Sequence, residues 1–160
     1  MKELSEEKFL SMPYSRIRIN EIEKNNFKLL AFCLMPNHFH LMVEQIKDTP
    51  ISSLMSKLCT SYAKYINQKY EKVGHVFQDK FKAVLVENNP QLMWTSSYIH
   101  MNPVKDKIVK HPSEYKWSSY NDIASNRDLL IVNKALLIET FGDEKSFEKE
   151  TLNFDVKDGL

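Results

Sequence analysis

The fold of this chain is decided by residues 27–43, which read FKLLAFCLMPNHFHLMV. Residues 27–34 form a short apolar run that Pro36-Asn37 ends, and this pattern favours a buried strand. From residue 38 the side chains alternate, so His38 and His40 share one face while Phe39 points inward from the other. Two strands around a short turn predict a β-hairpin.

Further elements are expected on both sides of this hairpin. Apolar residues follow the 3.6-residue period over residues 51–70, which predicts a helix with Ser52 or Ser53 as its N-cap. Residues 81–86 alternate as a strand would. A second long helix should start near residue 88, pass through residue 98, and stop at Pro103. Residues 3–25 are expected to be mostly helical, and residues 133–141 to form a last helix.

Length and charge point to one main domain. The chain has 160 residues and a net charge of +1, so bulk charge does not indicate a nucleic-acid partner. The distribution of charge is more informative, since residues 57–82 hold six lysines and two acids, whereas residues 139–160 hold seven acids and three lysines. The middle could therefore face phosphate. We expect a domain over residues 1–125, followed by a C-terminal helix and acidic tail over residues 126–160.

The cysteines and the apolar runs indicate the compartment. Cys33 and Cys59 have no metal-like spacing, so free thiols in a reducing cytoplasm are the simpler interpretation. The N-terminus lacks the apolar region of a signal peptide, and no run reaches the roughly 18 apolar residues that cross a bilayer. We expect a soluble, cytoplasmic protein with no membrane partner.

His38 and His40 form the first candidate site. Alternation along a strand places both imidazoles on one face, about 7 Å apart at the backbone, where they can chelate one divalent metal. An H-x-H pattern is weak by itself, and the alternative is that both histidines are merely polar surface.

Tyr98 and Asn102 form the second candidate site. Four residues apart on a helix, they lie on one face, one turn from each other. A tyrosine hydroxyl beside a metal-polarised phosphate can act as a nucleophile, and the amide of Asn102 could add an oxygen ligand. The alternatives are that Tyr98 is a packing residue and that Asn102, before a proline, is only a helix stop.

Two further segments combine aromatic and polar side chains. Residues 74–82, GHVFQDKFK, suit single-stranded nucleic acid because bases stack on aromatics and lysines pair with phosphates, although an ordinary loop is the alternative. Residues 117–120, WSSY, are expected to pack in the core. The candidate DNA-binding residues are Lys57, Lys64, His75, Gln78, Lys80 and Lys82.

In order along the chain, four blocks resemble the HUH transposases that use one tyrosine, and within them the REP-associated tyrosine transposases. The blocks are LMPNHFHLMV at residues 34–43, GHVFQDKFK at 74–82, YIHMNPV at 98–104 and YKWSSY at 115–120. The resemblance covers about residues 27–121.

The resemblance implies an α+β, ferredoxin-like fold with an antiparallel sheet and helices on one face. It implies a metal-dependent nuclease and strand transferase that cuts and rejoins single-stranded DNA near a hairpin, such as a REP-like sequence or an element end, through a 5′-phosphotyrosine. His38 and His40 match the metal-binding histidines, Tyr98 the nucleophile, and Asn102 the position of a third ligand. The metal would be Mg²⁺ or Mn²⁺.

One departure from the family pattern bears on activity. Relatives usually begin with a strand that is central in the sheet, and this chain is expected to lack it, which would expose unpaired strand edges. The alternative functions are a truncated remnant that binds hairpin DNA without cutting it, and a metal hydrolase without strand transfer. Whether the protein is a monomer or a homodimer is left open.

Overall fold

The computed structural model of the chain describes residues 26–125, 127 and 131–154. The expected helix over residues 3–25 and the expected absence of a first strand lie outside these residues. The chain divides into two compact units, one with residues 1–26 and 45–84, the other with residues 27–44 and 85–160. A two-stranded antiparallel sheet combines with helices, so the expected α+β class is confirmed, and the pair of strands is consistent with a shortened ferredoxin-like arrangement.

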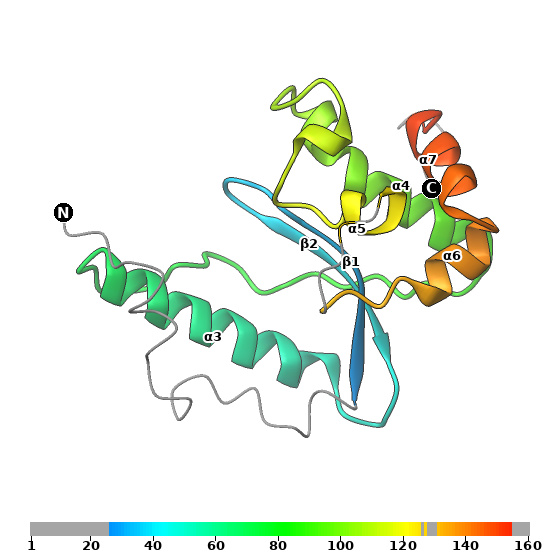
Figure 1. Cartoon of the computed structure of the whole chain (residues 1–160). Coiled ribbons are helices and arrows are strands. Elements are labelled where there is room, and N and C mark those ends of the chain that lie inside the picture. Colours follow the sequence, from blue (N-terminus) through cyan, green and yellow to red (C-terminus); the bar gives the residue numbers. More distant parts are fainter. Residues whose placement is uncertain (1–25, 126, 128–130, 155–160) are drawn as a thin grey trace. The chain divides into compact units, whose positions relative to one another are not determined.

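The second unit is built on the predicted hairpin (Figure 1), whose strands are β1 (Phe27–Leu34) and β2 (Phe39–Gln45). The amide of Met35 donates to the carbonyl of His38 at 2.9 Å and closes the turn. Met42, on the histidine face of β2, is buried, while Phe39 on the opposite face is only half-buried. The expectation that Phe39 points inward is therefore wrong. The histidine face turns inward instead, because Met42 packs in one apolar cluster with residues of the long helix that begins at residue 89.

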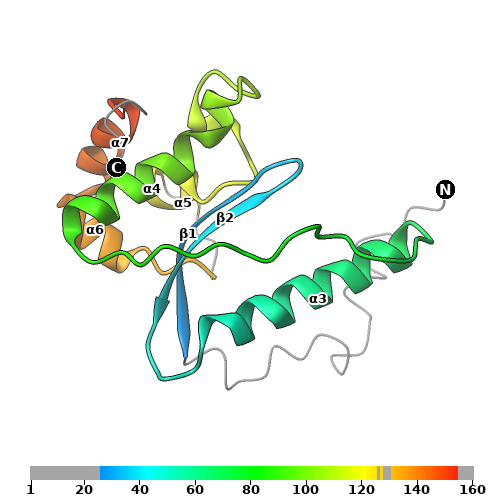
Figure 2. The same ribbon diagram turned by 180° about the vertical axis from the view of Figure 1, so that it is seen from behind.

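That helix is α4 (Asn89–Lys105), and it carries the candidate nucleophile. Figures 1 and 2 show α4 beside the hairpin. The helices α6 (Ala135–Phe141) and α7 (Glu144–Leu152) pack against α4. The prediction that the helix stops at Pro103 is wrong by one half turn, since it continues to Lys105. Proline removes one backbone donor. Pro103 is fully buried, however, and the amide of Asp106 still donates to the carbonyl of Asn102 at 2.9 Å.

The start of α4 allows a prediction on stability. The side chain of Asn88 accepts a hydrogen bond from the amide of Gln91 at 2.9 Å and caps the helix. Because a lost N-cap typically costs about 1 kcal/mol, Asn88→Ala should lower the free energy of unfolding by that amount in urea titrations. Asn89→Ala, at the first helical position, is the matched control and should change it by much less. Equal effects of both substitutions would argue against the cap.

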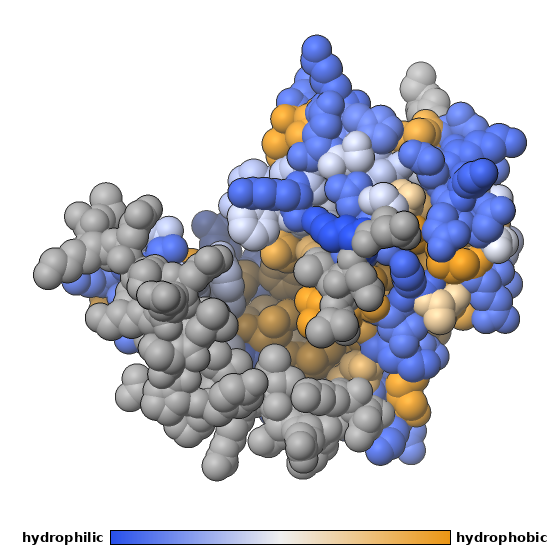
Figure 3. Space-filling model, viewed as in Figure 1, coloured by the Kyte–Doolittle hydropathy of each residue, from blue (hydrophilic) through white to orange (hydrophobic). Residues whose placement is uncertain are grey.

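Two short helices end the described chain. The expected helix over residues 133–141 is confirmed as α6, and Gly142 ends it with φ of 95°, a conformation that glycine adopts without strain. The sequence analysis did not anticipate α7 within the acidic tail. Its N-cap is Asp143, whose side chain accepts from the amide of Ser146 at 2.6 Å, and it buries Phe147 and Thr151, four residues apart. Hydrophilic side chains cover most of the surface around α7 (Figure 3).

The first unit contains the other long helix, α3 (Ile51–Lys69). The helix was predicted, but the predicted cap at Ser52 or Ser53 is wrong, because Pro50 occupies the N-cap and no side chain makes a capping hydrogen bond. The strand expected over residues 81–86 is wrong, since the structure describes this segment without a strand. Val84 is 77% exposed and Leu85 76%, so burial does not stabilise a ladder here. Within the described residues, no helix is long and apolar enough to cross a membrane.

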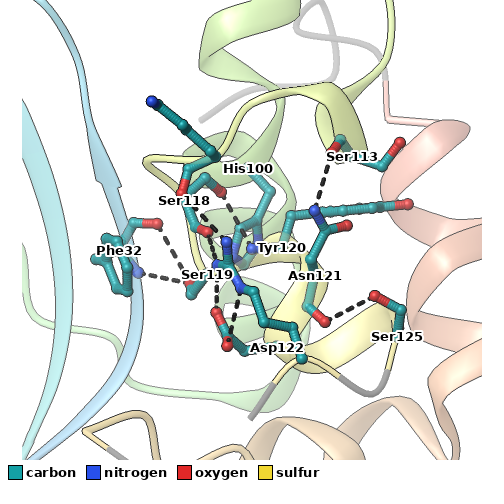
Figure 4. Close-up of polar contacts among 11 residues, drawn as sticks. Phe32, His100, Ser113, Ser118, Ser119, Tyr120, Asn121, Asp122 and Ser125 are labelled. Atoms are coloured by element: carbon teal, nitrogen blue, oxygen red, sulfur yellow. Dashed lines mark hydrogen bonds and ion pairs between the residues drawn. The ribbon is translucent and has the colours of Figure 1, made fainter. Parts of the chain in front are cut away.

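A buried polar junction joins β1, α4 and the loop before α5 (Tyr120–Ala124) (Figure 4). The hydroxyl oxygen of Ser119 lies 2.8 Å from the amide nitrogen of Phe32, from which it accepts, and 2.9 Å from Nε2 of His100. Both Ser119 and His100 are fully buried. The junction therefore ties the strand of the hairpin to the helix that carries Tyr98.

The same junction makes stability depend on pH. Burial lowers the pKa of His100 from 6.5 to about 4. Below pH 6.5 the unfolded chain takes up a proton that the folded chain does not, so stability is lost as pH falls from 6.5 towards 4, by roughly 3 kcal/mol in all. Urea unfolding of the wild type and of His100→Gln at a series of pH values checks this. The variant should show a shallower loss over this window, and parallel curves would contradict it.

Candidate active site

His38 and His40 lie together at the turn end of the hairpin, as the alternation predicted. Their ring centroids are 4.9 Å apart, and the rings meet edge to face at 89°. Nδ1 of His38 lies 2.7 Å from Oδ1 of Asn37, which orients the ring. Nε2 of His40 is buried and, among the described residues, has no hydrogen-bond partner. A buried ring nitrogen without a partner is costly, and a metal ion is one of the few ligands that satisfies it.

Tyr98 lies directly beside this pair. Its ring contacts that of His40 edge to face, with 5.6 Å between the centroids. On another side the indole of Trp94 stacks on it, with centroids 5.4 Å apart and planes at 8°. The amide nitrogen Nδ2 of Asn102 donates to the carbonyl of Tyr98 at 2.7 Å. Three of the four residues predicted for the centre, His38, His40 and Tyr98, are thus brought together by ring contacts, and Asn102 bonds to the backbone of Tyr98.

The charges around the centre favour a neutral imidazole and an anionic ligand. Burial lowers the pKa of His40, and His38 and Lys105 act in the same direction against the opposing charge of Asp106. A neutral ring is the form that binds a metal. Nζ of Lys105 lies 5.4 Å from the centroid of the Tyr98 ring, so a positive charge lies close to the phenol.

The donor set suits a divalent metal held by imidazole nitrogen and amide oxygen. Two adjacent imidazoles, one with an unpartnered buried nitrogen, fit such an ion. In the part of the chain that the structure describes, no cluster of three or more His, Cys, Asp or Glu residues exists. Asn102, the third ligand predicted from the sequence, is buried, and its role as a ligand stays a prediction.

Trp94 and Lys105 were missed by the sequence analysis. They lie four residues before and seven residues after Tyr98, which places all three on one face of α4. This helical spacing from Tyr98 is the sequence feature that could have identified them. Without knowledge of where the hairpin packs, a tryptophan and a lysine on a helix cannot be distinguished from ordinary packing and surface residues.

The residues predicted to bind DNA lie in the first unit. All of them are exposed, on α3 or on the segment that follows it. Within that unit the rings of Tyr62 and Phe77 contact each other at 5.8 Å. Their part in DNA binding stays a prediction. The residues are Lys57, Lys64, His75, Gln78, Lys80 and Lys82.

Comparison with known proteins identifies the family of this chain. The family described as "Transposase IS200 like" matches residues 6–102, more than half of the chain. The chain belongs to the IS200-like transposase family. The match includes His38, His40, Tyr98 and Asn102.

A curated relative of this IS200-like transposase comes from Haemophilus influenzae. That protein is named as a REP-associated tyrosine transposase and is 26% identical over 107 residues, which are 59% of this chain and 60% of the relative. The chain therefore spans about three fifths of the length of that relative. No solved structure matches. The resemblance predicted from the four sequence blocks is confirmed at the level of the family.

Proposed function

We propose that this IS200-like transposase is a metal-dependent enzyme that cleaves and rejoins single-stranded DNA near hairpins, with Tyr98 as its nucleophile. The observation that carries the proposal is the meeting of two imidazoles with one tyrosine. Residues 38 and 40 come from the hairpin and residue 98 from α4, yet His40 and Tyr98 have their rings in contact.

His38, His40 and Asn102 would hold Mg²⁺ or Mn²⁺. When bound, the ion supplies a positive charge that polarises the scissile phosphate as a Lewis acid. The lowered pKa of His40 keeps its ring ready for a metal at neutral pH. The bond of Asn102 Nδ2 to the carbonyl of Tyr98 supports this assignment, because it occupies the nitrogen and leaves the amide oxygen as the atom that would bind the ion.

Tyr98 would attack the phosphorus through Oη. The new bond joins Oη to phosphorus, and the bond from phosphorus to the 3′ oxygen breaks. The phenol proton is lost, and the leaving oxygen gains a proton to become a free 3′-OH. Because the product is a 5′-phosphotyrosine ester, a second 3′-OH can reverse the step and join strands without a nucleotide cofactor.

The neighbours of Tyr98 would orient the ring and receive the anion. Trp94 stacks on one side of the ring and the edge contact with His40 limits it on another, so few rotamers remain. Lys105 would place its charge next to the phosphate, where negative charge builds up during the attack.

A covalent-adduct assay tests the proposal. The protein is mixed with Mn²⁺ and 3′-labelled hairpin oligonucleotides from its own genomic neighbourhood and run on a denaturing gel. A label at the mass of the protein, lost with EDTA, is the expected result. A folded protein that binds the hairpin but forms no adduct would be a binding remnant, and cleavage without an adduct would indicate a metal hydrolase.

A further inference from the structure

The helix α7 packs along α4, the helix that carries Tyr98 (Figures 1 and 2). Side-chain contacts between them recur at successive turns. They pair Phe147 with His100, Thr151 with Ser97, and Phe154 with Trp94. Residue numbers rise along one helix as they fall along the other, so the chain returns antiparallel to α4. Its end therefore arrives at the turn that precedes Tyr98.

The end of α7 is fixed by buried contacts. Thr151 is fully buried, and its hydroxyl oxygen lies 3.3 Å from that of Ser97, the buried residue directly before Tyr98. Phe154 follows just past α7, and its amide donates to the carbonyl of Thr151 at 3.3 Å. The backbone that carries the ring of Phe154 is therefore tied to a buried residue, which is in turn bonded to α4.

Phe154 contacts the ring that supports Tyr98. The centroids of Phe154 and Trp94 are 5.4 Å apart, with their planes at 65°. The same indole stacks on Tyr98, with centroids 5.4 Å apart and planes at 8°. Edge contacts and near-parallel stacks both favour a defined ring geometry beyond simple burial. Phe154, Trp94 and Tyr98 therefore form a continuous row of rings that ends at the candidate nucleophile.

The indole at position 94 carries a cost that packing alone does not explain. Nε1 of Trp94 is buried and, among the described residues, has no hydrogen-bond partner. A buried donor without an acceptor is destabilising, and a leucine or phenylalanine would fill space here without one. The indole does offer a broad flat face, and Tyr98 lies against it nearly parallel.

We propose that Phe154 is a positioning residue for the reaction: it holds the indole of Trp94, and the indole holds the ring of Tyr98 in the orientation from which Oη attacks. The inference rests on the proposed function. Small misplacements of reacting atoms cost large factors in rate, so a support behind the nucleophile affects the chemistry more than the binding. The role falls to a segment beyond residues 6–102, which the family matches.

Kinetics of the full-length chain test this role. The rate of adduct formation is measured with Mn²⁺ at saturating hairpin DNA, and the affinity for the same DNA is measured without metal. Phe154→Ala should slow the adduct about tenfold and leave the affinity within about twofold. Phe154→Tyr keeps the ring and should restore the rate. Leu152→Ala is the matched control, since Leu152 lies on α7 and is 40% exposed, and it should react like the wild type.

A double-mutant cycle separates positioning from a general loss of stability. Trp94→Ala should also slow the adduct. If Phe154 acts through Trp94, adding Phe154→Ala to Trp94→Ala should leave the rate unchanged. Losses that multiply in the double variant would show that Phe154 acts by another route and would overturn the proposal.

Fluorescence reports on the support without any DNA. The chain has two tryptophans, so Trp117→Phe leaves Trp94 as the sole one. Trp117 was expected to pack in the core, and this is wrong, since it is 54% exposed while residues 118–120 are buried. In this background, Phe154→Ala should give the indole faster and wider local motion in time-resolved anisotropy. Unchanged motion would contradict the support.

A second variant covers the case in which Phe154→Ala does not fold. Phe154→Leu keeps the apolar volume without a ring, so it should also slow the adduct and loosen the indole, by less. Wild-type rate and wild-type anisotropy in the folded leucine variant would overturn the proposal.

Failure of the positioning role and failure of the proposed function give different results. If the wild type forms the covalent adduct and folded Phe154→Ala forms it at the same rate, the positioning role is wrong and the transposase function stands. If the folded wild type binds the hairpin and forms no adduct, the proposed function is wrong and the positioning role falls with it.

Discussion

Tyr98→Phe should abolish the covalent adduct with DNA while leaving the affinity for hairpin DNA within about twofold. The substitution removes one hydroxyl and keeps the ring, so the stack with Trp94 and the edge contact with His40 remain. The ester to phosphorus cannot form without Oη, and loss of a covalent nucleophile is typically close to total. The labelled oligonucleotide should therefore stay free on a denaturing gel and shift on a native one.

The control for this substitution is an exposed tyrosine of the first unit. Tyr62 is 49% exposed and lies on α3, so Tyr62→Phe should leave the adduct in place. Adducts that persist in Tyr98→Phe would show that Tyr98 is not the nucleophile. Tyr62 and Tyr65 would then be the next residues to substitute.

His40→Ala should lose metal binding and cleavage together. Among the described residues, Nε2 of His40 is buried and has no hydrogen-bond partner, and the ring touches both His38 and Tyr98. Its removal would therefore take away a proposed metal ligand and one of the ring contacts that hold Tyr98 in place. A Lewis-acid metal contributes several kcal/mol to such a step, and a loss of about 3 kcal/mol corresponds to at least a hundredfold in rate. Titration calorimetry with Mn²⁺ reports binding, and the rate of adduct formation reports the chemistry.

A histidine outside the centre serves as the control. Nδ1 of His111 lies 2.7 Å from the hydroxyl of Ser113, in the short 3₁₀ helix η2 (Pro112–Glu114) and its cap, so His111→Ala should bind Mn²⁺ like the wild type. His40→Ala that stays folded and binds Mn²⁺ with unchanged affinity would contradict the assignment of His40 as a ligand. Thermal unfolding of each variant separates loss of the ligand from loss of the fold.

The local elements could be predicted from the sequence because short-range rules decide them. The apolar run of β1, the turn at Pro36-Asn37 and the alternation through His38 and His40 are readable within one segment, and the hairpin formed as expected. The same holds for the start of α4 near residue 88, which the local sequence Asn-Asn-Pro indicates without a distant partner. The family resemblance rests on these same blocks, which is why it could be identified before any fold was known.

Most of the errors concern contacts between distant segments. Residues 81–86 have the composition of a strand, but a strand needs a second strand to pair with, and Val84 and Leu85 are exposed. Pro103 could remain inside α4 because tertiary packing buries it. The ring of Trp117 lies outside the core because hydrogen bonds to Arg127 and Leu34 fix the backbone of its segment.

By itself, the sequence determined the hairpin, the helix that carries Tyr98 and the family. Only the tertiary structure decided which face of the hairpin is inside, that the ring of His40 touches that of Tyr98, and that Trp94 and Lys105 belong to the same centre. The physical reason is the range of the interactions. Periodicity and capping act within one turn or strand, whereas the centre depends on a contact between His40 and Tyr98, which are 58 residues apart in the sequence. The hairpin and α4 are joined by buried contacts such as those of Ser119 with Phe32 and His100.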